Sequence, residues 1–146
     1  MSKVISIGNQ GFEDIRKNDN FYVDKTDFIR EWWESRDIVT LITRPRRFGK
    51  TLNMDMLKCF FSNRYAGRSD LFEGLSIWKE EKYRELQGQY PVIFLSFANV
   101  KEGNVEAAKM QMKALIARMY EENRFLLEGN LLSENEKKMY RNVTIY

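Results

Sequence analysis

Residues 41–52 read LITRPRRFGKTL, and this stretch decides the expected fold. An apolar run from Ile38 leads into it, and a helical pattern of apolar residues begins directly after Thr51. A buried strand, a loop that ends in Gly-Lys-Thr and a helix, in this order, form a phosphate-binding P-loop. The stretch therefore predicts a phosphate site in an α/β fold.

The chemistry of this site follows from the start of the helix. The first N–H groups of a helix have no partner within it, and the helix dipole makes that end positive. A polyphosphate accepts hydrogen bonds from these N–H groups, and its negative charge is attracted by the positive helix end. Gly49 would let the backbone approach the phosphates, Lys50 would reach the β- and γ-phosphates, and the Thr51 hydroxyl would bind Mg²⁺. The predicted nucleotide-binding residues are Arg44, Pro45, Arg46, Arg47, Phe48, Gly49, Lys50, Thr51 and Leu52.

The loop departs from the full pattern G-x-x-x-x-G-K-S/T, because Arg44 stands at its first glycine position. A plain basic turn is the alternative. The local charge favours the phosphate site, since no acid occurs between Asp37 and Asp55 while four basic residues do. Asp55 itself is interpreted as an exposed helix residue, with a metal-linked role as the alternative. We identify no catalytic residue.

Composition limits the remaining classes of function. The chain has 146 residues, 43% hydrophobic and 14% aromatic, which predicts one globular domain. It contains no histidine, which excludes histidine-based catalysis and histidine metal sites. Its single cysteine, Cys59, is expected to be a buried apolar residue and fits a reducing cytoplasm. No run approaches the roughly 18 apolar residues of a membrane helix, so we expect a cytoplasmic protein without a membrane.

Apolar periodicity predicts the order of the elements. Helices are expected at about 27–35, 51–63, 79–86, 104–123 and 133–141, and strands at 38–43, 92–97 and 142–146. Residues 1–36 would form an N-terminal extension with a helix, and residues 37–146 the P-loop core. Two helical stripes are expected to be core: Leu52, Met56, Leu57, Phe60 and Phe61, and then Val105, Ala108, Met112, Leu115, Ile116 and Met119. The expected architecture is a P-loop NTPase-like, partial parallel sheet flanked by helices.

Five blocks of the chain resemble the AAA-ATPase-like proteins of bacteria. These blocks are YVDKT (22–26), ITRPRRFGKTL (42–52), LKCFF (57–61), and LFEGLSI (71–77) with YPVIFLSF (90–97). The resemblance covers nearly the whole chain, and the family's own P-loop carries arginine at the position of Arg44. It implies a P-loop NTPase fold that binds ATP with Mg²⁺. Many members also carry a C-terminal nuclease-like domain. The preference for ATP over GTP rests on this resemblance alone.

The chain departs from the family in one respect, because no acidic Walker B motif of the form I-D-E-Y-D occurs in it. The aspartate of that motif holds Mg²⁺, and a neighbouring acid orients the attacking water. We therefore expect the N-terminal half of an ATPase module, with nucleotide binding and weak or absent hydrolysis. Whether the chain acts as an enzyme stays undecided. An open strand edge predicts a homo-oligomer or a sheet completed by a partner.

Two alternatives to nucleotide binding stay open. The P-loop could be vestigial in a protein-interaction or scaffold domain. The basic loop could instead bind nucleic acid together with stacked aromatic residues, in which case affinity would fall steeply with added salt.

Overall fold

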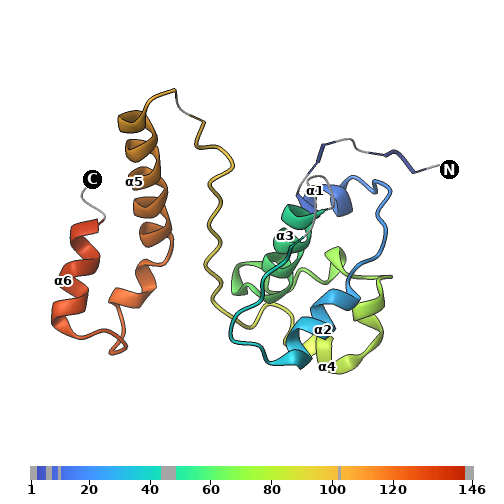
Figure 1. Cartoon of the computed structure of the whole chain (residues 1–146). Helices are drawn as coiled ribbons and strands as arrows, with labels where there is room; N and C mark the ends of the chain where they lie inside the picture. Colours follow the sequence, from blue (N-terminus) through green and yellow to red (C-terminus); the bar gives the residue numbers. More distant parts are fainter. Residues whose placement is uncertain (1–2, 6–7, 10, 44–48, 102, 144–146) are drawn as a thin grey trace. The chain divides into compact units, whose positions relative to one another are not determined.

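The computed structural model describes residues 3–5, 8–9, 11–43, 49–101 and 103–143. Two compact units, Met1–Val92 and Ile93–Tyr146, divide the chain (Figure 1). Helices form the regular structure of both units in the described part of the chain. Because the units are separate bodies, each is described by itself.

The first unit holds the helices that surround the predicted phosphate site. Its elements are α1 (Phe12–Lys17), α2 (Asp27–Ser35), α3 (Lys50–Phe61), η1 (Asn63–Tyr65), η2 (Ser69–Leu71), η3 (Ser76–Lys79) and α4 (Glu81–Leu86). The helices predicted at 27–35, 51–63 and 79–86 are thereby confirmed, with shifts of at most two residues at their ends.

One face of α3 forms the centre of the core. Met56, Cys59 and Phe60 are fully buried there, and α1 packs against the same helix (Figure 1). The Phe60 ring meets the Phe72 ring edge to face at 5.1 Å, and Phe72 stacks on Phe12 at 5.2 Å. The predicted stripe of α3 is confirmed, since Phe61 is also buried and Leu52 and Leu57 pack against this cluster.

A buried threonine ties the start of α2 to η3. The Thr26 side chain is fully buried, and its hydroxyl donates to Asp24 Oδ1 at 2.6 Å while it accepts the Ile77 N–H at 3.1 Å. The second oxygen of Asp24 accepts the Ser76 N–H at 2.7 Å. Burial raises the pKa of Asp24, but the hydrogen bonds from Thr26 and Ser76 outweigh it, so the pKa lies below its usual value. We call these four residues the 24–26/76–77 clamp.

The predicted sheet is not present, so the expectation of an α/β, P-loop NTPase-like fold with a partial parallel sheet is wrong for the described residues. Neither 38–43 nor 92–97 forms a strand, and the isolated bridge between Ser62 and Tyr90 joins other segments. Several apolar side chains of these runs are exposed, by 101% at Ile38 and 60% at Ile93. A parallel strand needs neighbours to take its N–H and C=O groups, and apolar sequence alone supplies none. The strand expected at 142–146 begins inside a helix and continues outside the described residues.

The second unit contains α5 (Val105–Glu122), η4 (Arg124–Leu127) and α6 (Glu134–Val143). Both predicted helix starts are confirmed by their caps. The Asn104 side chain accepts the Ala107 N–H at 2.8 Å, and the Glu136 carboxylate accepts the Ser133 N–H at 2.8 Å.

The prediction that α5 buries a core stripe is wrong in this unit. No residue of α5 is buried, and Val105 is 67% exposed. Its contact with α6 runs through the Tyr120 and Tyr140 rings, 4.6 Å apart, and through the Tyr140 hydroxyl, which donates to the Tyr120 carbonyl at 2.6 Å. A periodic stripe indicates that a helix can be buried, but burial requires a facing surface.

The clamp predicts a stability cost for Thr26→Val. Valine keeps the shape of threonine but leaves the Ile77 N–H without its acceptor in a buried position. We expect the free energy of unfolding to fall by about 1–3 kcal/mol, measured by urea denaturation. Thr40→Val, at an exposed position, is the matched control and should change it little. Equal effects of the two variants would contradict a stabilising clamp.

A second stabilising group lies on α1. Glu13 pairs with Lys17 at 2.6 Å and with Arg68 Nη1 at 2.8 Å, and it also accepts the Tyr65 hydroxyl at 3.2 Å. Lys17 and then Arg68 lower the pKa of Glu13 from its ordinary 4.5 to about 2. Because the pKa is lower in the folded state, this stabilisation is present above pH 4.5 and is lost as the pH falls toward 2.

We therefore expect Glu13→Gln to reduce the acid sensitivity of folding. The loss of unfolding free energy between pH 6 and pH 2.5 should be smaller than in the wild type by about 1 kcal/mol, a value typical of partly exposed pairs. Glu85→Gln, an exposed glutamate on α4, should leave the pH dependence unchanged. Parallel curves for the wild type and Glu13→Gln would show that Glu13 carries no such stabilisation.

Candidate functional site

The first turn of α3 has the backbone geometry that an anion site needs. Gly49 is the residue before the helix and adopts φ 75° and ψ 18°, a left-handed conformation that favours glycine. Its carbonyl accepts the Asn53 N–H at 2.9 Å, which closes the first helical turn. Among the residues that the structure describes, no side chain caps this end of α3. The N–H groups of Lys50, Thr51 and Leu52 therefore have neither a side-chain cap nor a partner further along the helix.

Three of the predicted site residues, Gly49, Lys50 and Thr51, lie together at the start of α3. A fourth, Leu52, has a different role. Lys50 begins α3 and is half-buried, and Thr51 follows it with an exposed side chain. Leu52 packs against the hydrophobic core, so its contribution is packing. The predicted residues Arg44, Pro45, Arg46, Arg47 and Phe48 lie outside the described residues.

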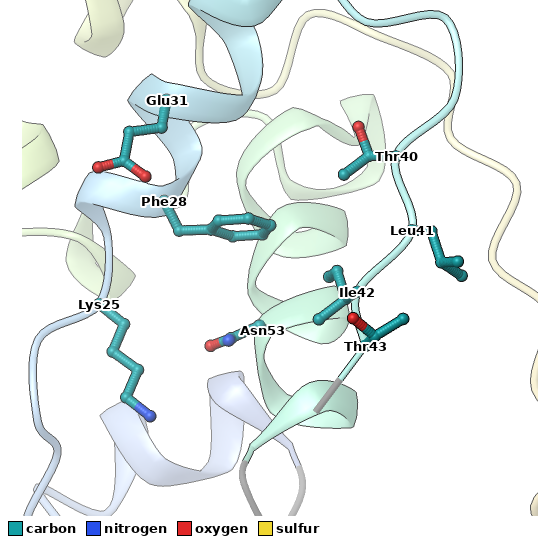
Figure 2. Close-up of a pocket in the computed structure, with 8 residues that line it drawn as sticks. All are labelled: Lys25, Phe28, Glu31, Thr40, Leu41, Ile42, Thr43 and Asn53. Atoms are coloured by element: carbon teal, nitrogen blue, oxygen red, sulfur yellow. The ribbon is translucent and has the colours of Figure 1, made fainter. Parts of the chain in front are cut away.

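A pocket of about 540 Å³ adjoins the first turn of α3. It is lined by Lys25, Phe28 and Glu31 from the α2 segment, by Thr40, Leu41, Ile42 and Thr43, and by Asn53 of α3. Figure 2 shows the Phe28 ring pointing into this space, with Lys25 toward the start of α3 and Glu31 farther along α2. The volume falls within the roughly 300–1,000 Å³ that is usual for small-molecule sites.

Lys25 is one of the pocket residues that the sequence analysis did not predict. Its ammonium lies 3.6 Å from the position that a Cβ atom on Gly49 would occupy. Lys25 belongs to the YVDKT block, but nothing in the sequence relates that block to a glycine 24 positions later. The helix predicted at about 27–35 gave the only signal, because it places Lys25 just before a helix start.

Asp55 has a structural role rather than either role expected for it. Its side chain is 13% exposed, and its Oδ2 accepts the Phe12 N–H at 2.8 Å, which caps α1. Its other oxygen pairs with Lys58. Among the residues that the structure describes, no group of three or more Asp, Glu or Cys side chains could hold a metal ion.

Cys59 is confirmed as a buried apolar residue. Its side chain is fully buried on α3, and burial raises the pKa of the thiol to about 12. The thiolate needed for nucleophilic attack is therefore absent at neutral pH.

Comparisons with known proteins agree with the resemblance seen in the sequence. The family described as "Predicted AAA-ATPase" matches residues 6–144. A curated relative from Azotobacter chroococcum mcd 1, "Uncharacterized protein in vnfD 5'region", is 38% identical over 96 residues, which are 65% of this chain. The chain spans only 17% of that relative's length. No solved structure matches the chain.

No helix in the described part of the chain combines the length and apolar character needed to cross a membrane. The match to the family covers nearly all of the sequence, including the Gly49-Lys50-Thr51 turn. The chain belongs to the family of predicted AAA-ATPases.

Proposed function

We propose that this chain binds ATP with Mg²⁺ through residues 44–51, with the phosphates at the first turn of α3. The observation that carries the proposal is the left-handed Gly49, which opens into an uncapped helix start with Lys50 beside it. Membership of the predicted AAA-ATPase family supports the choice of a nucleotide. The preference for ATP over other nucleotides rests on the family.

The phosphate end of the site follows from electrostatics. The uncapped N–H groups of α3 and the helix dipole attract an anion, and Lys50 adds a full positive charge. Lys50 makes no ion pair with another residue in the described part of the chain. The exposed Thr51 hydroxyl would bind the Mg²⁺ that accompanies the phosphates.

The nucleoside end of the site would be the neighbouring pocket. It begins beside the α3 turn and continues past the Phe28 ring, which offers an apolar surface to a base or ribose. The tryptophans of α2 are not needed for this role, because the rings of Trp32 and Trp33 pack on Phe61 at 5.3 and 5.5 Å.

Hydrolysis by this chain would be weak or absent. Cleavage of the γ-phosphate needs an acid that holds Mg²⁺ and a group that orients water. The sequence contains no Walker B motif, and Asp55 already caps α1. Binding requires only the loop and the helix start, so binding and hydrolysis are separable properties.

Calorimetric titration of Mg-ATP tests the proposal. We expect saturable binding to the wild type and at least a 10-fold loss of affinity in Lys50→Ala, because the variant loses the cation at the phosphates. Lys138→Ala is the matched control, since it removes one exposed lysine from α6 in the other unit. Absence of binding at millimolar Mg-ATP would contradict the proposal and favour a domain with a vestigial P-loop.

Self-association is a second candidate property, favoured by the exposed apolar side chains of residues 38–41. Ile38, Val39 and Leu41 are 101%, 84% and 82% exposed in the described structure, and only Thr40 lies between the second and the third. Contiguous exposed apolar residues are typical of contact surfaces. We propose that a second copy of the chain covers them, on the basis of this exposure and without the open strand edge from which the sequence predicted a homo-oligomer.

Sedimentation velocity tests this association. We expect the wild type to sediment as a dimer or larger species at micromolar concentration. Ile38→Lys should shift it toward the monomer, because a charge would be buried in the contact. A wild-type protein that sediments as a compact monomer would contradict self-association.

A further inference from the structure

We propose that Lys25 is a second phosphate-binding cation, which acts with Lys50 on the phosphates of the bound nucleotide. This inference rests on the proposed nucleotide site and adds to it a residue from a different element. Of the other residues in the YVDKT block, Tyr22, Asp24 and Thr26 make contacts that hold the first unit together.

The backbone of Lys25 is fixed on both sides. Asp24 and Thr26 belong to the 24–26/76–77 clamp, which holds the turn before α2 against η3. The Lys25 N–H also donates to the Tyr22 hydroxyl at 3.4 Å, and that hydroxyl donates to the buried Met56 sulfur of α3 at 3.3 Å. The turn that carries Lys25 is thereby linked to the helix whose first turn forms the site.

The Lys25 side chain extends toward the same helix start. Its ammonium is 3.6 Å from the position of a Cβ atom on Gly49, so it lies beside the left-handed turn. Figure 2 shows the side chain along the edge of the pocket, toward the start of α3. An anion held by the first N–H groups of α3 would be within reach of this flexible side chain.

The positive charge of Lys25 is not neutralised by another residue that the structure describes. No ion pair or side-chain hydrogen bond involves its ammonium among those residues. Asp24 is engaged by Thr26 and Ser76, and Asp55 by Phe12 and Lys58. Glu31 lines the pocket farther along α2.

Two unpaired lysines beside a positive helix end repel each other unless an anion lies between them. A polyphosphate supplies several negative charges and can contact both ammonium groups at once. A lysine binds phosphate as a point charge on a flexible stem, so Lys25 and Lys50 can approach from different directions. The contribution of Lys25 should therefore depend on the phosphates and be independent of the base.

The test compares three probes, Mg-ATP, inorganic tripolyphosphate and adenosine, by calorimetric titration. For Lys25→Met we expect roughly 5- to 50-fold weaker binding of Mg-ATP and of tripolyphosphate, as for a lost charge-assisted hydrogen bond. The affinity for adenosine should not change. Lys25→Arg keeps the charge and should bind Mg-ATP within about 3-fold of the wild type. Lys138→Met, the matched control, should bind all three probes as the wild type does.

The outcomes separate this inference from the proposed function. If the wild type binds Mg-ATP and Lys25→Met binds it equally well, the role of Lys25 is wrong and the nucleotide site stands. If Lys25→Met weakens adenosine as much as Mg-ATP, Lys25 supports the pocket and the phosphate role is also wrong. If the wild type binds neither Mg-ATP nor tripolyphosphate, both proposals fail. Lys25 is exposed, and urea denaturation would verify that its variants stay folded.

Discussion

The burial of one face of α3 is the constraint on which the first unit depends. Phe60 and Met56 are fully enclosed by α1 and by the short helices that follow α3. Exposure of such an aromatic ring or thioether to water would cost roughly 1.5–3 kcal/mol of transfer free energy per side chain. Rotation of α3 would expose these side chains and would therefore be costly. Its orientation then fixes where its first turn lies. The same helix therefore contributes its buried face to the core and its first turn to the candidate site.

Polar contacts between residues that are far apart in the sequence hold the surroundings of the candidate site against α3. Asp55 caps α1 from a position 43 residues later in the chain, and the 24–26/76–77 clamp spans about as far. The Asp55 and Thr26 side chains thereby satisfy half-buried and buried backbone N–H groups that would otherwise be costly to leave unpaired. Together they hold the turn with Lys25 beside Gly49. The lysines of the candidate site are therefore positioned by hydrogen bonds in which no charged lysine or arginine side chain takes part.

Local patterns predicted local structure well. The helix starts at Asn104 and Ser133 followed from side chains that cap within three residues, and the α3 stripe followed from its period. The role of Lys25 and of Asp55 could not be predicted, because each depends on a contact with a distant segment. A single sequence holds no periodic signal for such contacts. The YVDKT block pointed to residues 22–26, but it did not indicate which distant segment they contact.

Runs and stripes of apolar residues predicted burial less well than local patterns predicted helices. Residues 38–43 and the α5 stripe both have the pattern of buried elements, yet Ile38 and Val105 are exposed in the described structure. The pattern states that a segment can be buried, and the surface that buries it must come from elsewhere. The chain spans 17% of its curated relative, so the family match and the described fold concern only a part of such a protein.

The most direct test of the account follows the backbone amides of residues 49–52 by NMR during titration with Mg-ATP. If α3 binds phosphate at its first turn, these amides should shift in a saturable manner, and the shifts should disappear in Lys50→Ala. Amide signals of residues 49–52 that do not move at millimolar Mg-ATP, in a protein whose other signals show it to be folded, would contradict the central claim.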